Sequence, residues 1–195
     1  MPEGSGRSYR RASERRAEVI EAAIELFAAR GVSTSLRNIG DAIGVSHAAL
    51  RYHFPSRDEL LVDVYRAHEH SFADPLEANS AVAGMRASAE RNRGIPGLVE
   101  LYATLTTDAL QGEEHPVTRE FITERFRDLR ARLREAVVAQ QEAGSVPADL
   151  DPGDVAALII AASDGLQLQW LLEPGAVDVE RSLAVLERLL PGIRE

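Results

Sequence analysis

The 195-residue sequence contains no cysteine and no long apolar run, and both absences narrow what the chain can be. Without cysteine there is no disulfide, no thiolate metal site and no cysteine nucleophile. The apolar run at 156–162 is far shorter than the roughly 20 residues that a membrane-spanning helix needs. The first 13 residues are rich in arginine but lack the apolar stretch of a secretory signal. We therefore expect a cytoplasmic protein that has no membrane partner.

The net charge of −9 alone disfavours binding to nucleic acid, but the charge is unevenly distributed. Residues 1–57 carry nine arginines and six acidic residues, whereas the remaining 138 residues carry thirteen arginines and twenty-five acidic residues. All of the basic residues are arginines. This asymmetry indicates an N-terminal end that faces DNA and a solvated acidic body.

Apolar residues recur at the three- and four-residue spacing of helices, and few stretches alternate as strands do. One stripe, in a helix that Gly31 ends, consists of Ile20, Ala23, Ile24 and Phe27. A capping box at residues 56–59 opens a later helix. Others are expected at about 77–92, 96–111, 117–143 and 151–172, the last of these opened by Asp151 and Pro152, and Asp178 caps a final helix. The pattern predicts an all-α fold.

Near the N-terminus, two short helical patterns at about 35–42 and 47–53 are separated by a turn that contains glycine. This arrangement predicts a helix-turn-helix, with Ser46 as the N-cap of the second helix. Gly40 would allow the helices to cross closely, and Gly44 would form the turn. Apolar side chains would lock the pair together at Ile39, Val45 and Leu50. The outer face of the second helix is then available to a DNA major groove.

Residues 14–65 resemble the DNA-binding domain of the TetR family of bacterial regulators. The first helix carries the family's pattern at Ala23, Leu26, Phe27 and Gly31, and the match then runs without gaps from Thr34 to Leu60. The sequence departs from the family at Gly40, which is usually alanine, at Arg51, which is often aromatic, and at Arg57, which is usually lysine. The resemblance implies an N-terminal three-helix domain followed by a C-terminal helical bundle that forms a two-fold dimer interface.

By this resemblance, the DNA-binding residues fall into three groups. Phosphate contacts near the start of the first short helix are expected from Thr34 and Ser35, and Arg37 could reach a base or a phosphate. On the second short helix, the residues expected to face bases are His47, Ala48, Ala49 and Arg51, and Ser46 lies on the same DNA-facing side. A phosphate clamp is expected at Tyr52, His53 and Arg57. For Arg51 an ordinary solvated arginine is the alternative.

The chain is expected to have four parts: a flexible Arg-rich arm at 1–12, a helix-turn-helix domain at 13–55, a connecting helix at 56–73 and a ligand-binding and dimerisation domain at 74–195. The arm could follow a minor groove or be a plain disordered tail. Dimer contacts are expected at Ile160, Gly165, Leu168, Leu172, Leu183, Leu186 and Leu190. Candidate effector contacts are Met85, Tyr102, Phe121, Phe126, Asp164 and Trp170, although an ordinary core would use the same residue types.

These features predict a sequence-specific DNA-binding repressor that a small molecule releases from a palindromic operator. The alternative is an activator or architectural protein that needs no ligand. No nucleophile–base set or metal-binding motif is present, so we expect neither an enzyme nor a metal site or cofactor. His68 and His70, two residues apart, do not share a helix face, and His115 falls in an expected loop.

Overall fold

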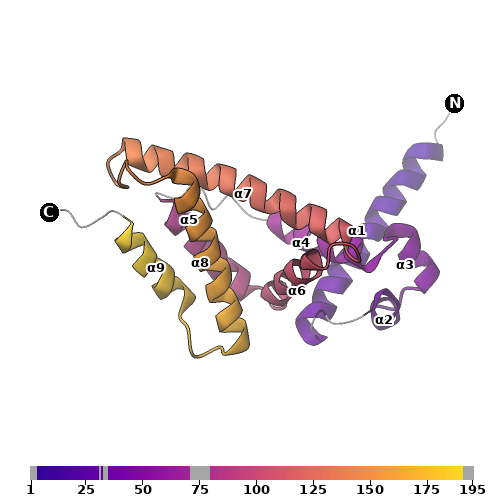
Figure 1. Cartoon of the computed structure of the whole chain (residues 1–195). Coiled ribbons are helices and arrows are strands. Elements are labelled where there is room, and N and C mark those ends of the chain that lie inside the picture. Colours follow the sequence, from indigo (N-terminus) through magenta and orange to yellow (C-terminus); the bar gives the residue numbers. More distant parts are fainter. Residues whose placement is uncertain (1–3, 31, 33–34, 71–79, 191–195) are drawn as a thin grey trace. The chain divides into compact units, whose positions relative to one another are not determined.

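The computed structural model describes residues 4–30, 32, 35–70 and 80–190, and within these ranges it contains helices and no strand (Figure 1). The all-α fold predicted from the sequence is confirmed. The helices are α1 (Gly4–Arg30), α2 (Leu36–Ala42), α3 (His47–His53), α4 (Arg57–His70), α5 (Ala81–Gly94), α6 (Leu98–Leu110), α7 (Pro116–Glu142), α8 (Pro152–Leu172) and α9 (Val179–Leu189).

Short-range capping bonds begin most of the helices at the expected residues. Ser56 and Glu59 form the predicted capping box, in which the Ser56 N–H donates to Glu59 Oε2 at 3.0 Å and the Glu59 N–H donates to Ser56 Oγ at 3.2 Å. The Asp151 carboxylate accepts from two N–H groups at the start of α8, and Asp178 caps α9. These bonds satisfy backbone donors that a helix cannot satisfy itself.

The first helix is longer than the sequence suggested. It starts at Gly4, so most of the segment expected to be a flexible arm is helical backbone. Arginine and alanine are good helix formers, and no proline follows Pro2 in this segment, so the helix continues towards the N-terminus. The helix expected at about 77–92 is α5, which covers residues 81–94.

The chain divides into two compact units, each made of two separate stretches. Unit 1 comprises residues 1–72 and 96–121, and unit 2 comprises 73–95 and 122–195. In unit 1, α1 packs against α2, α3 and α4, and α6 packs against α4. Its interior contains the side chains of Ala23, Phe27, Ile39, Leu50, Phe54, Leu60, Leu61, Leu101 and Leu105, all almost fully buried.

Unit 2 is built on α5, α8 and α9, each of which contacts the other two. The later part of α7 adds Leu129, Leu133 and Val137 to the same core. By length and composition α8 could cross a membrane, a criterion that core helices of soluble proteins also meet, and only one third of its most apolar stretch is buried within this chain. Much of the apolar surface of α8 is therefore exposed.

Candidate nucleic-acid interface

The crossing of α2 and α3 depends on a residue without a side chain. A Cβ added to Gly40 would lie 2.8 Å from the Val45 carbonyl oxygen and 3.3 Å from Leu50 Cδ2. Gly44 forms the turn with a φ of +71°, a conformation that favours glycine. The predicted close crossing is confirmed, and it fixes α3 against α2 through the fully buried Ile39 and Leu50.

The side of α3 opposite Leu50 faces solvent. The exposed residues there are the ones expected to face DNA: Ser46, His47, Ala48, Ala49, Arg51 and Tyr52. Ser46 also caps α3, because its Oγ accepts from the Ala49 N–H at 3.2 Å. Tyr52 is 78% exposed, and its ring meets the half-buried His53 edge-on. The local fold thus leaves this row of polar and small side chains available to a partner.

Near the start of α2, Ser35 and Arg37 are both exposed. The Ser35 hydroxyl caps the helix by accepting from the Asn38 N–H at 3.2 Å. Thr34, the other residue expected to meet phosphate here, lies outside the described residues. The phosphate contacts at this end of α2 stay predictions.

Arg57 is partly buried and has protein partners. Its guanidinium donates to Asp108 Oδ2 at 2.9 Å and to the Val32 carbonyl at 3.4 Å, and it lies 3.9 Å from Asp58 Oδ1. A phosphate bound by Arg57 would have to share or replace the Asp108 carboxylate. The role expected for Arg57 in a phosphate clamp therefore stays a prediction, because the Asp108 carboxylate competes with phosphate for the guanidinium.

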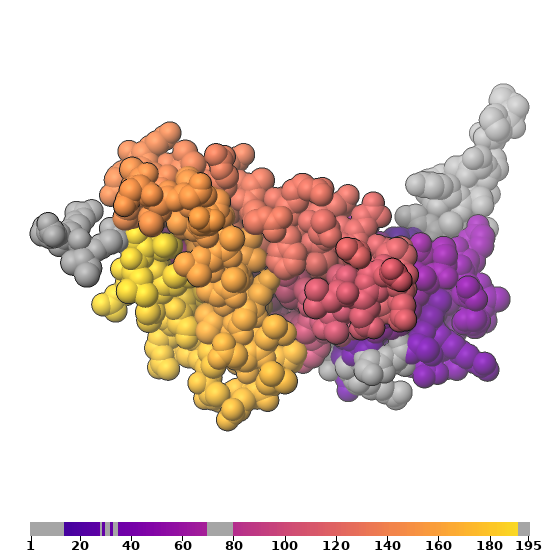
Figure 2. Space-filling model, viewed as in Figure 1, coloured from indigo at the N-terminus to yellow at the C-terminus, as the bar shows by residue number. Residues whose placement is uncertain are grey.

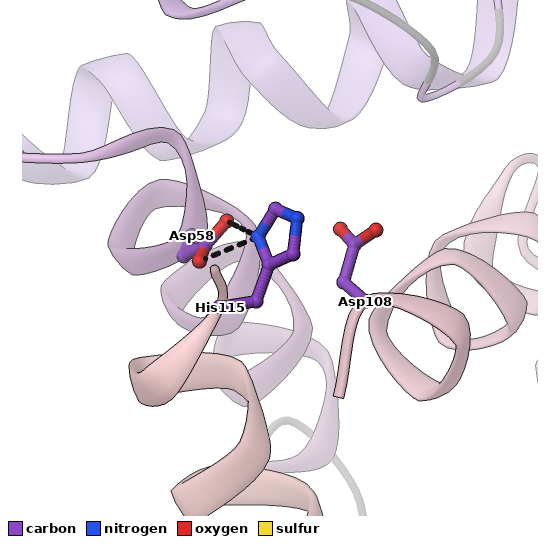
Figure 3. Close-up of side chains that lie close together, drawn as sticks. All are labelled: Asp58, Asp108 and His115. Carbon is purple, nitrogen blue, oxygen red and sulfur yellow. Dashed lines mark hydrogen bonds and ion pairs between the residues drawn. The ribbon is translucent and has the colours of Figure 1, made fainter. Parts of the chain in front are cut away.

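Beside Arg57 lies a polar cluster that the sequence did not predict (Figure 3). We call Asp58, Asp108 and His115 the acid–histidine cluster. His115 Nδ1 lies 2.9 Å and 3.1 Å from the two carboxylate oxygens of Asp58. The first turn of α4, the last turn of α6 and the residue before α7 supply the three side chains. No local pattern could reveal a pair that is 57 residues apart.

Comparison with known proteins identifies the family to which this arrangement belongs. Residues 19–64 match the profile described as "Bacterial regulatory proteins, tetR family", and residues 109–194 match that described as "BetI-type transcriptional repressor, C-terminal". The chain belongs to the TetR family. It is a DNA-binding transcription regulator and not an enzyme, as the sequence predicted.

Curated relatives of this TetR-family chain align over most of its length. It is 28% identical to the HTH-type transcriptional regulator TtgR of Pseudomonas putida, over 97% of this chain and 99% of TtgR. It is 26% identical to the HTH-type transcriptional repressor KstR2 of Rhodococcus jostii, over 86% of this chain and 85% of KstR2. The crystal structure of AibR in complex with isovaleryl coenzyme A and operator DNA has the same fold, with a TM-score of 0.62 and 23% identity over 90% of this chain and 97% of AibR.

The residues expected to contact an effector are divided between the two units of this TetR-family chain. In unit 1, Tyr102 stacks on Tyr65 and Phe121 meets Tyr65 edge-on. In unit 2, Met85 is buried in the core, and Phe126 packs against that core. The Arg93 guanidinium lies 5.4 Å from the centre of the Trp170 ring. Asp164 is half-buried on α8, and the effector role of all six residues stays a prediction.

The residues expected at a dimer interface differ in how far this chain already buries them, and their dimer role stays a prediction. Ile160 and Leu183 are buried in the core of unit 2, because the inward stripes of α8 and α9 pack against α5. Of the other expected residues, Leu168 and Leu172 are exposed, whereas Gly165, Leu186 and Leu190 are half-buried. On the same two helices, Leu158, Val185 and Leu189 are further exposed apolar residues. Together with Leu168 and Leu172 they form what we call the α8–α9 face, on helices that adjoin one another in Figure 2.

Proposed function

We propose that this TetR-family regulator is a homodimeric repressor that binds a palindromic operator through α3 and is released from it by a small molecule. The observation that carries the proposal is the orientation of α3. Leu50 is completely buried on one side of the helix, whereas Arg51 and Tyr52 are exposed on the other. An exposed recognition helix held by a buried crossing is what insertion into a major groove requires.

The exposed side chains of α3 suit sequence readout. A guanidinium at Arg51 can pair bidentately with guanine, and the methyl group of Ala48 or Ala49 can contact the methyl group of thymine. Each good bidentate pair discriminates against a wrong base by about 1–3 kcal/mol. Tyr52 and His53, at the end of the helix, are placed to donate to phosphates, which fix the register but carry no sequence information.

Dimerisation through the α8–α9 face would cover the exposed apolar surface of α8. Leu158 and Leu168 are about half exposed, and Leu172 is 86% exposed. A two-fold partner would bury this patch and present two copies of α3, which suits half-sites about 34–36 Å apart or a multiple of that distance. We favour this explanation over a membrane because the protein acts on DNA, which places it in the bacterial cytoplasm.

A small-molecule effector is supported by the match to a repressor C-terminal domain and by the solved relative AibR, whose structure is described as a complex with isovaleryl coenzyme A and operator DNA. A ligand shifts a two-state protein only as far as its affinities for the two states differ. Moving the population from 1:99 to 99:1 requires about 5.5 kcal/mol of differential affinity. An effector that binds better to a dimer whose two α3 helices do not match the operator half-sites would therefore release the operator.

Selection from a random pool of duplexes, at low and at physiological salt, tests the proposal. We expect a palindrome that remains enriched at the higher salt concentration. The selected duplex then serves in a screen of apolar and cationic metabolites, in which an effector lowers operator affinity and raises the melting temperature of the protein.

Two other results would contradict parts of the proposal. Binding without enrichment, lost as salt rises, would favour an architectural protein held by phosphate contacts alone. A selected palindrome that no metabolite releases, with no shift in melting temperature, would favour a regulator that needs no ligand.

A further inference from the structure

The acid–histidine cluster brings a metal-ligand set together in unit 1. One nitrogen of His115 and one oxygen each of Asp58 and Asp108 all lie within 4.8 Å of one another. Asp58 is 8% exposed, and the other two side chains are partly buried. Imidazole and carboxylate together form a ligand set that suits divalent transition ions.

The two nitrogens of His115 have different surroundings. An ionised carboxylate only accepts hydrogen bonds, so the Nδ1 that faces both oxygens of Asp58 carries a proton and donates it. The other nitrogen, Nε2, lies on the side of the ring that faces the Asp108 carboxylate (Figure 3). In the neutral ring Nε2 is also an acceptor. Two acceptors that face one another can share a metal ion, a proton or a bridging water.

Two carboxylates and one guanidinium meet at the cluster. Asp58 and Asp108 supply two negative charges, and the Arg57 guanidinium supplies one positive charge. Arg57 binds Oδ2 of Asp108 at 2.9 Å but remains 3.9 Å from Asp58. Asp58 therefore keeps its carboxylate close to His115 and away from the Arg57 guanidinium. Partly buried carboxylates of this kind are stabilised when they pair with a cation or coordinate a metal ion.

We propose that the acid–histidine cluster binds a divalent transition ion of the zinc class. His115 Nε2 and the Asp108 carboxylate are the direct ligands, and water completes the coordination. Asp58 orients the imidazole through its bond to Nδ1–H, the arrangement that most metal-binding histidines use. Arg57 competes with the ion for the Asp108 carboxylate. Metal binding here requires neither the operator nor the effector. An ion that displaces Arg57 would make its guanidinium available to a phosphate of the operator.

Zinc titration of the full-length chain, after removal of metal with a chelator, tests the site. Competition with a fluorescent zinc chelator measures the affinity, with Mg²⁺ as the comparison ion. We expect His115→Ala to abolish one zinc site per chain. Asp58→Asn keeps an acceptor for Nδ1–H but removes the charge, and we expect it to lower the affinity about tenfold, the lower end of the range for outer-shell partners.

Two further variants separate metal binding from a general loss of structure. Arg57→Gln removes the competing cation, so it should raise zinc affinity, a gain that misfolding cannot produce. Glu113→Gln removes an exposed carboxylate two residues from His115 and should leave the affinity unchanged.

Equal zinc stoichiometry and affinity in the wild type and His115→Ala would overturn the proposal, as would a zinc affinity that Arg57→Gln leaves unchanged. A His115 ring that NMR shows to be protonated on both nitrogens at pH 7, in a chain that binds no zinc, would also overturn it. In that case a proton, and not a metal ion, would lie between His115 and Asp108.

Discussion

Tyr52 presents its hydroxyl to solvent at the end of α3, and 78% of its surface is exposed. If this hydroxyl donates to a phosphate, Tyr52→Phe removes one bond to a charged group and nothing from the core. We expect operator affinity to fall by about tenfold, from a loss near 1.5 kcal/mol. The fall should be equal for specific and random duplexes, and the salt slope should not change because tyrosine is uncharged. Fluorescence anisotropy at several salt concentrations measures both quantities.

An affinity loss confined to the specific duplex would instead assign Tyr52 to base readout. Because the hydroxyl lies on an exposed side chain, the variant should unfold at the same temperature as the wild type. A lower melting temperature would show that Tyr52 supports the fold.

His68 gives stability a pH dependence, because burial lowers its pKa below the ordinary value of 6.5. The unfolded chain therefore binds more protons at this residue than the folded chain as the pH falls. This contribution to the free energy of unfolding is complete above pH 6.5 and is lost as the pH falls below it. We expect His68→Gln to lose less stability than the wild type between pH 7.5 and pH 5.5, measured by urea unfolding. Parallel curves for the two proteins would contradict this account of His68.

Single residues could be predicted from the sequence where a local pattern placed them. The outward position of Arg51 followed from the helical spacing around Leu50, and the structure has both as expected. The partners of Arg57 could not be predicted, since Asp108 lies 51 residues away. The family pattern suggests a phosphate contact for Arg57, and only the structure shows the carboxylate that competes for it.

At the scale of elements, the crossing of α2 and α3 has no space for a larger residue at position 40. The 2.8 Å approach to the backbone oxygen of Val45 cannot be relieved by moving a side chain. We expect Gly40→Val to destabilise the chain by about 1–3 kcal/mol, the usual cost of overpacking. It should also misplace α3 and so weaken operator binding. Chemical denaturation and anisotropy measure the two effects.

Gly94→Val is the matched control, since a Cβ at Gly94 meets nothing within 4 Å. It makes the same substitution at the end of α5 without a clash. If both variants lose the same stability, the cost reflects the valine backbone preference, and the close crossing is not the cause.

Helix boundaries were predictable where a cap lies within a few residues of the helix that it serves. Ser56 with Glu59, and Asp151 with Pro152, are signals of this kind, and both appear in the structure. The start of α1 at Gly4 was missed because no capping residue marks it and arginine-rich sequence also suits an extended arm. In such a segment only the weak helix propensity of each residue favours a helix over an extended arm.

For the whole molecule, the α8–α9 face is the surface through which two chains are proposed to associate. Leu172 on α8 and Leu110 on α6 have almost the same exposure, 86% and 88%, which makes them a matched pair. We expect Leu172→Glu combined with Leu168→Glu to halve the molecular mass in solution, because burying unpaired charges in an interface is costly. Leu110→Glu should leave the dimer intact. Light scattering after size exclusion measures the mass, and a dimeric double variant would contradict the proposed face.

The sequence could not distinguish leucines that pack within one chain from those that meet a partner. Ile160 and Leu183 have the spacing expected of an interface, yet both complete the core of unit 2. Leu158, Val185 and Leu189 are exposed, but their sequence spacing does not distinguish them from the buried residues. Periodicity reports that a helix face is apolar, and only the packed structure shows what already covers it.

Duplex selection with two proteins tests whether α3 reads the operator. One is the wild type, and the other carries His47→Ala and Arg51→Ala, which leave the buried Leu50 and Ile39 untouched. We predict that the wild type enriches a palindrome and that the variant, equally folded and dimeric, enriches none or a degenerate one. If the variant enriches the same motif with the same strength, α3 does not read the operator sequence.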